Sequence, residues 1–399
     1  MQRIPIPLLL LVSGCSLTDP VFPPGTSRND ILYGPQATPA GKEKKGDNAH
    51  LWVSAVEYPE GYDWKRDTAR GSVPCRLVLF KDGDRALELP VGSGISPDAD
   101  MHRIVGGHLY TDGCTATETV IACDGAERFR YPGRESLRGF LIDGDGSVHT
   151  LGQNRDGPGF SYRIDGESVY EQPTGNLFGS PGCGTLRGGA LYRDGASLCF
   201  AFVTGGGHAL LWKDGKEEEL FLDEPSHIFD IRSVGGRAVA VYVNRESGLR
   251  LSCDGTDYCP ASLMAVSARI LPDRTGGFLV AVRYRNRDGQ EIDALVDESG
   301  LLTNDTIPGG RVEWIPGMDE NSSIRLDGNG KVTVISWKGK ADPPETGRWT
   351  LMGPTCIWMD EKEAWVALTG QPPECPALWH QGEMTTLLMN GYLTGVVYE

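Results

Sequence analysis

The chain of 399 residues has 53 glycines and 26 prolines, with 39% hydrophobic and 23% charged residues. Glycine and proline together make up about a fifth of the sequence, below the share typical of low-complexity disorder, so the composition indicates a folded protein rich in turns. The formal net charge is -16 at pH 7. Because a nucleic-acid-binding surface needs clustered Lys and Arg, this acidic balance excludes nucleic acid as a partner.

The N-terminus carries a short apolar run, residues 4–12, behind the single positive charge of Arg3. A helix that spans a bilayer needs about 20 apolar residues, so this run predicts a secretory signal peptide over residues 1–14. The sequence Val12-Ser13-Gly14-Cys15 resembles the lipobox of bacterial lipoproteins. The resemblance implies cleavage before Cys15, lipidation of Cys15 and anchoring to a membrane, and Ser16 implies the outer membrane of a Gram-negative cell. The alternative is an ordinary signal peptide followed by an incidental cysteine.

Residues 15–48 contain scattered prolines and charges without apolar periodicity. Such composition is typical of a tether, here a lipidated one that ends where the folded domain begins. We therefore expect three parts, namely the signal peptide, the tether and one domain over residues 49–399.

Nine cysteines follow Cys15, and a compartment outside the cytosol favours disulfides between them. The pairs that lie close together in the sequence are Cys114/Cys123, Cys183/Cys199, Cys253/Cys259 and Cys356/Cys375, which leaves Cys75 over. We expect two or more of these bridges. The sequence has no Cys-x-x-Cys, and its seven histidines are scattered, so it lacks the ligand spacing of structural zinc. No metal and no cofactor are predicted.

From residue 50 onward, short runs rich in Val, Leu, Tyr and Trp alternate with turn signals, and no segment has a clean helical period, which indicates an all-β protein. Asp-Gly and related pairs recur at hairpin positions, because both central residues of a type I′ turn need positive φ. These turns end at Gly83, Gly125, Gly166, Gly215, Gly255, Gly300, Gly339 and Gly382. Their mean spacing is about 43 residues, a period typical of propeller blades.

A second set of turn positions precedes these glycines by 18 to 23 residues, at Gly107, Gly146, Gly195, Gly236, Gly277, Asp319 and Glu361. Two hairpins per period mean four strands per unit, so the sequence predicts a closed β-propeller with eight blades. Seven blades are the alternative, because Pro343 and Pro344 would interrupt the fourth strand of the unit around Trp337. The C-terminal strand, residues 392–398, would close the ring by completing the first blade, which begins at residue 50 without its opening strand.

The hairpin Trp212-Lys213-Asp214-Gly215 resembles the tryptophan-lysine-asparagine-glycine hairpin of propeller lipoproteins from Gram-negative bacteria. Residues 75–89 and 376–388 repeat the pattern. The resemblance implies a propeller in the cell envelope, and it implies no particular reaction because that family is mostly uncharacterised.

Sequence motifs for chemistry are missing. The chain has no Gly-x-Ser-x-Gly elbow, phosphate loop, His-Glu-x-x-His helix or dinucleotide fingerprint. The sequence therefore favours a monomeric, non-enzymatic binding or scaffold module that presents its loops to an envelope protein or glycan. The alternative is a hydrolase or lyase acting on extracellular polysaccharide or peptide, to which pairs such as Asp319/Glu320 and Glu361/Glu363 would contribute. Convergence of three or more His, Asp, Glu or Arg side chains in the channel would favour that enzyme.

Three further features have alternative interpretations. The insertion over residues 59–74 carries Tyr62, Trp64 and Arg66, which we take as candidate partner contacts. The acidic residues of segment 143–147 are of the type that binds calcium. The segment coincides with one of the regularly spaced turns, however, so we expect a hairpin there. Three large aromatics stand three residues before a turn glycine, and we expect them to pack between blades rather than bind a ligand. They are Phe80, Trp212 and Trp379.

Overall fold

The structure is a computed structural model that describes residues 49–64, 75–90, 102–115, 117–178, 190–244, 246–261, 264–272, 276–305, 310–315, 318, 321–344, 348–352, 356–360, 362–370 and 375–399. The predicted signal peptide, Cys15 and the tether lie outside these residues. Within the described residues, no helix has the length and apolar character needed to cross a membrane.

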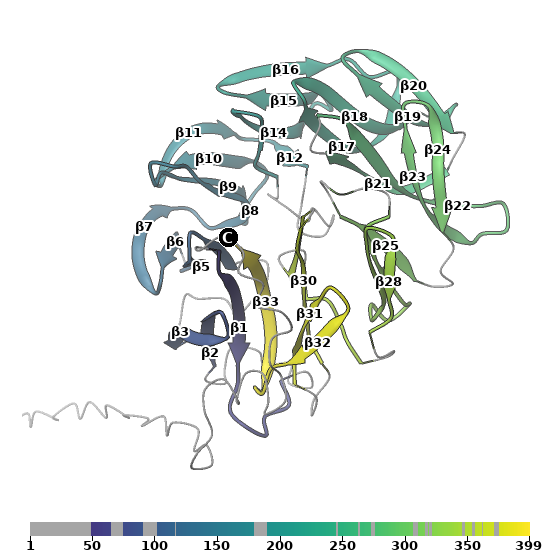
Figure 1. The fold of residues 1–399 in the computed structure, drawn as a ribbon. Coiled ribbons are helices and arrows are strands. Elements are labelled where there is room, and N and C mark those ends of the chain that lie inside the picture. Colours follow the sequence, from purple (N-terminus) through teal and green to yellow (C-terminus); the bar gives the residue numbers. More distant parts are fainter. Residues whose placement is uncertain are drawn as a thin grey trace, which may run out of the picture.

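The described strands form eight antiparallel sheets, one per blade, which follow one another around a ring in chain order (Figure 1). Blade 1 comprises β33 (Gly391–Tyr398), β1 (Leu51–Glu57), β2 (Arg76–Lys81) and β3 (Asp84–Pro90). Blade 2 comprises β4 (His102–Val105), β5 (His108–Cys114), β6 (Glu118–Cys123) and β7 (Ala126–Pro132). Blade 3 comprises β8 (Glu135–Ile142), β9 (Val148–Asn154), β10 (Phe160–Ile164) and β11 (Glu167–Gln172).

Blades 4 and 5 follow, and blade 4 has a divided first strand. Blade 4 comprises β12 (Gly175–Leu177), β13 (Tyr192–Asp194), β14 (Ser197–Thr204), β15 (Ala209–Lys213) and β16 (Lys216–Leu220), and both β12 and β13 pair with β14. Blade 5 comprises β17 (Pro225–Val234), β18 (Arg237–Asn244), β19 (Gly248–Cys253) and β20 (Thr256–Ala261).

Three blades complete the ring. Blade 6 comprises β21 (Met264–Pro272), β22 (Phe278–Arg285), β23 (Glu291–Asp297) and β24 (Gly300–Asp305). Blade 7 comprises β25 (Arg311–Trp314), β26 (Ser323–Leu326), β27 (Val332–Trp337) and β28 (Lys340–Asp342). Blade 8 comprises β29 (Ile357–Met359), β30 (Ala364–Leu368), β31 (Ala377–His380) and β32 (Glu383–Thr386). The fourth strand of blade 7 ends at Asp342, directly before Pro343, but the unit is still a blade.

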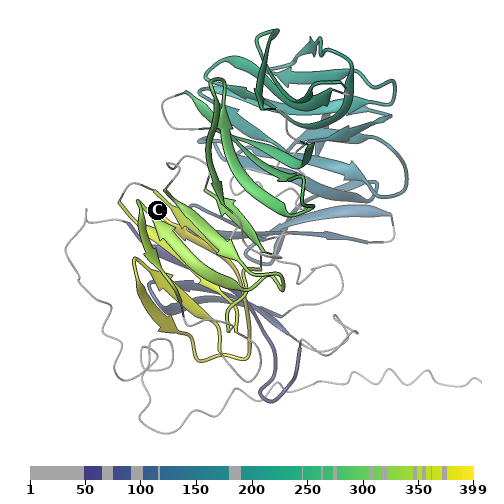
Figure 2. The same cartoon turned by 90° about the vertical axis from the view of Figure 1, so that its right-hand side faces the viewer.

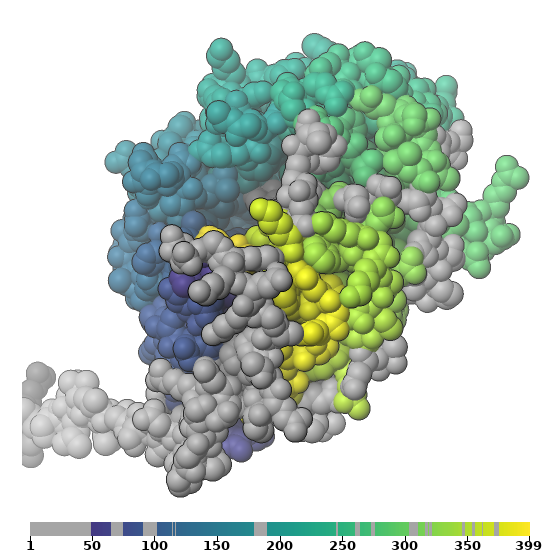
Figure 3. Space-filling view, in the orientation of Figure 1, coloured from purple at the N-terminus to yellow at the C-terminus, as the bar shows by residue number. Residues whose placement is uncertain are grey.

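The two ends of the folded chain meet in blade 1. Strand β33 pairs with β1 from Leu51↔Tyr398 to Glu57↔Gly391, and the His50 N–H donates to the Glu399 carbonyl oxygen at 2.6 Å. The turned view shows the yellow strands of the last blade beside the purple strands of the first, and the space-filling view places both on one side of the molecule (Figures 2 and 3). The closed eight-bladed propeller is therefore confirmed, as is its closure by the C-terminal strand, which pairs with β1 and so covers the edge that β1 would otherwise expose.

The predicted turn glycines explain the repeat. In blades 1 to 5 the turn between the third and fourth strands is an Asp-Gly pair, with Asp at φ 45° to 51° and Gly at φ 74° to 90°. Both residues are left-handed, as a type I′ hairpin requires, and Asp tolerates this conformation better than most residues. The second set of turns joins the first and second strands of each blade, although Asp319 and Glu361 lie outside the described residues.

The turn aspartate also holds the second strand of its own blade. Its Oδ1 accepts the backbone N–H of the first or nearly first residue of that strand, and its own N–H donates to the carbonyl oxygen of the same residue, so each pair of residues shares two hydrogen bonds. We call this arrangement the aspartate clamp. The five clamps are Asp82 on Leu51, Asp124 on Leu109, Asp165 on Val148, Asp214 on Leu198 and Asp254 on Ala238. The clamp gives the Asp in the repeat a structural role that glycine or alanine would not fill.

Packing between blades is aromatic and apolar. Phe200 and Trp212 stack at a centroid distance of 4.7 Å in blade 4, and Tyr162 of blade 3 lies 5.2 Å from Trp212. Phe80, Trp212 and Trp379 are all buried, which confirms their predicted packing role. Trp379 also donates its indole N–H to Asp342 of blade 7.

Buried carboxylates tie neighbouring blades to one another. Asp230 of β17 accepts the Ile270 N–H of blade 6 at 2.9 Å, and Asp293 of β23 accepts the Val312 N–H of blade 7 at 2.9 Å. Burial raises the pKa of Asp230, and Arg232 and the backbone N–H groups partly offset this effect. The first bond joins blade 5 to blade 6, and the second joins blade 6 to blade 7. Each bond therefore fixes one blade against the next.

Candidate functional site

A pocket lined by both charged and aromatic side chains lies between blades 2 and 3. Arg103 of β4 and Tyr110, Thr111 and Asp112 of β5 line one wall, and Leu137, Gly139 and Phe140 of β8 line the other. The empty volume is about 270 Å³, which includes space open to solvent. Two different blades contribute the walls, so the packing of blade 2 against blade 3 brings these residues together.

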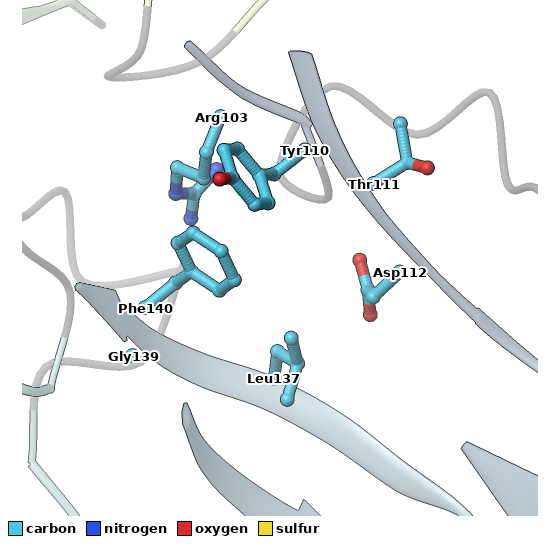
Figure 4. Close-up of a pocket in the computed structure, with 7 residues that line it drawn as sticks. All are labelled: Arg103, Tyr110, Thr111, Asp112, Leu137, Gly139 and Phe140. Atoms are coloured by element: carbon cyan, nitrogen blue, oxygen red, sulfur yellow. The ribbon is translucent and has the colours of Figure 1, made fainter. Parts of the chain in front are cut away.

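The two ends of this pocket, which we call the blade 2/3 pocket, carry opposite charges. Arg103 gathers with the rings of Tyr110 and Phe140 at one end, and Asp112 and Leu137 lie at the other (Figure 4). The Arg103 guanidinium donates to the His102 carbonyl oxygen at 2.9 Å, and the two rings lie 5.4 Å apart at 50°. Asp112 is only 4% exposed. The pocket can therefore receive a group that presents both an anionic and a cationic or hydrogen-bond-donating end.

Glycine at position 139 lets β8 sit between this pocket and blade 4. A Cβ at Gly139 would lie 2.3 Å from the Leu191 Cβ and 2.7 Å from the Leu191 backbone nitrogen. Real Cβ atoms do not approach other atoms that closely, so any side chain here would push the two blades apart. The small residue thus sets the shape of the pocket floor.

A second polar cluster lies between blades 3 and 4. The Tyr162 hydroxyl is 2.6 Å from His149 Nδ1, His149 Nε2 is 3.0 Å from Asp143 Oδ2, and Arg193 pairs with the other Asp143 oxygen. Tyr162 and His149 are only 2% and 6% exposed, and burial raises the pKa of Tyr162 to about 12. A buried neutral phenol is a poor nucleophile and a poor acid near neutral pH. The chain from Tyr162 to Arg193 is consistent with a structural tie between two blades.

The segment around Asp143 is a turn, as predicted. Gly146 N–H donates to the Asp143 carbonyl oxygen at 2.9 Å, and Ser147 N–H donates to Asp145 Oδ1 at 2.9 Å. The side-chain oxygens of Asp143 face His149 and Arg193, which are not the neighbours of a calcium ligand.

The described part of the insertion after β1, residues 59–64, carries Trp64 into the core. Trp64 is 3% exposed, stacks on Tyr58 at 6.3 Å and lies 4.9 Å from Tyr392 of β33. Tyr62 is half-buried and 5.3 Å from Tyr58, while Arg66 lies outside the described residues. Trp64 is therefore part of the packing beside the closing strand and leaves little surface for a partner, because a large aromatic side chain gains more from burial there than from exposure. The predicted partner contacts of Tyr62 and Arg66 stay predictions.

The predicted disulfides do not form among the described residues. Cys253 and Cys259 are free thiols, and the β19–β20 register separates their Cα atoms by about 11 Å, beyond the reach of a disulfide. The β5–β6 register likewise separates the Cα atoms of Cys114 and Cys123 by about 13 Å, because they stand at opposite ends of the pairing. Cys123 and Cys199 are free, and Cys183 lies outside the described residues.

The last predicted pair is separated by a strand. Cys356 comes directly before β29 and Cys375 comes before β31, with β30 between these two strands. The Cys356 thiol is buried and donates to the Leu393 carbonyl oxygen, while Cys375 is free. Closeness in sequence was a poor guide, because the strand register does not place the two cysteines of a predicted pair opposite each other.

Sequence reasoning missed Arg103, Asp112 and Phe140. One signal was present in the repeat itself. Asp112 stands three residues after its clamped residue, where the equivalent positions of the other clamped blades are Ser54, Leu151, Ala201 and Val241, all fully buried. Asp112 is the one acid at this position among the five clamped blades, but this comparison needs the blade register that the structure supplies.

No protein family model matches the chain, and no curated protein matches it. Among solved structures, the chain is similar to the WD40 domain of SCAP from fission yeast, with 8% identity, a TM-score of 0.42 and coverage of 87% of this chain and 91% of that chain. It is also similar to BamB from Moraxella catarrhalis, with 14% identity, a TM-score of 0.39 and coverage of 67% and 80%. These scores are too low to guide a functional argument, so the function is argued from the site alone.

Proposed function

We propose that this protein is a lipid-anchored envelope protein whose propeller binds a protein partner through the blade 2/3 pocket. The observation that carries the proposal is the pocket itself, in which a buried carboxylate, Asp112, and a guanidinium, Arg103, face a shared space walled by Tyr110 and Phe140. Arg and aromatic residues are the types that contribute most to protein–protein contacts. Propellers supply a rigid ring, and recognition comes from the groups placed on it.

The openness of the pocket favours a protein over a free small molecule. The space of about 270 Å³ between its walls includes open solvent, whereas a small-molecule site encloses most of its ligand. A partner would therefore bind across the mouth of the pocket and direct one polar side chain toward it. Its donor groups would meet Asp112, and an adjacent acidic or carbonyl group would meet Arg103.

The anchor is supported by the sequence around Cys15, which resembles a lipobox, and by the tether that follows it. We propose that Cys15 is lipidated after cleavage of residues 1–14 and that the protein is monomeric and attached to the outer membrane of a Gram-negative cell. Several acyl chains, each adding about 0.8 kcal/mol per buried methylene, hold a protein durably at a membrane. Replacement of Cys15 by Ser should move the protein from the membrane fraction to the soluble fraction, and unchanged fractionation would refute the anchor.

The binding proposal is tested by capture from envelope extract with the full chain and with two variants. Asp112→Asn should lower recovery of a specific protein at least about tenfold, the loss expected when a buried charged hydrogen bond is removed. The control is Glu167→Gln on the exposed fourth strand of blade 3, which should bind like the wild type. Equal recovery by Asp112→Asn and wild type would refute the pocket as the binding site. Capture of a glycan instead, or turnover of any captured polymer, would refute the protein-binding function.

A further inference from the structure

Three different metal-ligating side chains meet at the hairpin end of blade 2. They are His108 at the start of β5, Cys123 at the end of β6 and Asp124 in the turn that follows, and their ligand atoms all lie within 4.8 Å of one another. His108 Nδ1 is 2.7 Å from Asp124 Oδ2. The three residues come from positions 15 and 16 apart in the sequence, a spacing that no common zinc motif uses.

The backbone already orients the carboxylate of this trio. Asp124 holds a left-handed conformation with φ 51°, and its Oδ1 accepts the Leu109 N–H at 2.9 Å as part of the aspartate clamp. Its Oδ2 is therefore fixed on the side of His108. Ligands held by such outer hydrogen bonds are typical of protein metal sites, because the hydrogen bond sets the direction of the remaining lone pairs.

Comparison of the blades shows that the clamp itself does not need the other two residues. Blade 1 has the same His–Asp contact, His50 Nδ1 to Asp82 Oδ2 at 2.7 Å, but Lys81 takes the position of Cys123. Blade 5 has Cys253 before Asp254, but Arg237 takes the position of His108.

Blades 3 and 4 retain the clamp with Ser147 and Ser197 at the position of His108, and with Ile164 and Lys213 at the position of Cys123. Among the five clamped blades, only blade 2 combines the imidazole, the thiol and the carboxylate.

We propose that His108, Cys123 and Asp124 bind a zinc ion at the hairpin end of blade 2, with the fourth coordination position open to water or to a partner's side chain. Nitrogen, sulfur and carboxylate oxygen are the ligands that zinc takes in proteins, and three protein ligands with one open position are a common arrangement. In a tetrahedral site, neighbouring ligand atoms lie about 3.3–3.8 Å apart. The His108–Asp124 contact opens by less than about 1 Å on binding, and the Cys123 sulfur closes by a similar amount.

The surroundings allow both entry of the ion and loss of the thiol proton. The side chains of His108 and Asp124 are 59% and 35% exposed, so the site is open to solvent. Zinc binding releases the Cys123 proton to water and leaves a zinc–thiolate bond. Burial and the Asp124 carboxylate raise the pKa of Cys123, and the hydrogen bond with the Tyr110 hydroxyl and the nearby Arg128 offset this only in part, so the metal has to displace the thiol proton.

Tyr110 joins this site to the pocket. Its ring lines the blade 2/3 pocket, and its hydroxyl is hydrogen-bonded to the Cys123 thiol. A zinc ion would therefore sit beside the proposed partner-binding pocket, but its binding can be measured without any partner.

The full chain is first freed of metal and kept reduced. It is then titrated with Zn²⁺ in competition with a chromophoric chelator, and separately with Co²⁺ as a spectroscopic probe. We expect one tight equivalent and a thiolate-to-cobalt charge-transfer band. Cys123→Ser should abolish the band and weaken zinc binding more than about 100-fold, because loss of a direct ligand exceeds the 10–100-fold cost of losing an outer-shell partner. His108→Ala should weaken zinc binding as well, and its exposed position makes it a safe variant for folding.

The chain supplies its own matched controls. His50→Ala removes the equivalent imidazole of blade 1, and Cys253→Ser removes the equivalent thiol of blade 5, so both should bind zinc as the wild type does. Wild-type affinity in Cys123→Ser or in folded His108→Ala would overturn the proposal. So would a loss of the same size in either control, because it would place the ion elsewhere.

Discussion

The aspartate clamp makes a quantitative prediction at Asp214. The Asp214 Oδ1 accepts the Leu198 N–H at 2.8 Å, its own N–H donates to the Leu198 carbonyl oxygen at 3.1 Å, and its φ is 45°. Replacement by Ala removes the side-chain hydrogen bond and forces a Cβ-bearing residue without a polar group into the left-handed region.

The expected cost follows from these two parts. A hydrogen bond to an exposed, solvent-screened carboxylate contributes about 1 kcal/mol, and the left-handed conformation costs Ala about 1 kcal/mol, so Asp214→Ala should destabilise the fold by about 2 kcal/mol. Asp214→Gly keeps the conformation and loses only the bond, about 1 kcal/mol. Asp214→Asn keeps both an acceptor and the turn preference, so it should cost less than about 0.5 kcal/mol.

Thermal unfolding of the three variants separates these contributions. A folded unit of about 350 residues has an unfolding entropy near 0.7 kcal/mol/K, so 2 kcal/mol lowers the Tm by about 3 °C. Glu218→Ala, in the exposed β16 of the same hairpin, is the control and should leave the Tm unchanged. The reasoning is refuted if Asp214→Asn and Asp214→Ala lower the Tm equally, or if Asp214→Ala lowers the Tm no more than Glu218→Ala does.

Three further outcomes follow from the structure. Gly139→Ala should lower the Tm by several degrees, because the new Cβ would lie 2.3 Å from the Leu191 Cβ. The control is Gly144→Ala, whose Cβ would have no atom within 4 Å and which should leave the Tm unchanged. Similar Tm values for the two variants would contradict the packing between blades 3 and 4. Gly391→Ala should weaken ring closure, since its Cβ would lie 1.9 Å from the Val56 carbonyl oxygen, and hydrogen exchange of β33 should rise; unchanged exchange would contradict the closure geometry. Backbone hydrogen bonds hold the pKa values of Asp214 and Asp327 below their usual range, so their stabilisation is complete above the ordinary Asp pKa of about 4 and is lost as the pH falls through the lowered values. Asp214→Asn should therefore flatten the acid limb of a Tm-versus-pH curve, and an unchanged limb would show that Asp214 does not contribute to it.

The fold was predictable from the sequence because its hairpin turns need particular residues, which recur at a regular spacing. Positive φ at two consecutive residues restricts the hairpin to pairs such as Asp214-Gly215, and the recurrence of such pairs fixed both the strand count and the blade count. The closing strand was predictable for a related reason, because an unpaired strand at each end of an all-β chain is resolved most simply by pairing the two.

The site was not predictable, since it depends on neighbours from different blades. Arg103 and Phe140 are ordinary strand residues until the packing of blade 2 against blade 3 places them around one pocket. The sequence around Trp64 is typical of an exposed loop. Only its contact with Tyr392 of the closing strand shows that Trp64 belongs to the core. The proposed zinc ligands His108, Cys123 and Asp124 were not predictable for a third reason. The β5–β6 hairpin brings Cys123 back to His108, and their separation in the sequence depends on the strand lengths and matches no zinc motif.

The most direct test of the proposed function is site-specific photo-crosslinking in the cell that produces the protein. A benzophenone side chain replaces Phe140 inside the blade 2/3 pocket, and the control carries the same group at Phe221, which is 83% exposed beyond the end of β16 in blade 4. We predict one discrete protein adduct from position 140 that is absent from position 221 and is lost when Asp112 is changed to Asn. No adduct at position 140, or the same adducts from both positions, would contradict the assignment of the pocket as the binding site.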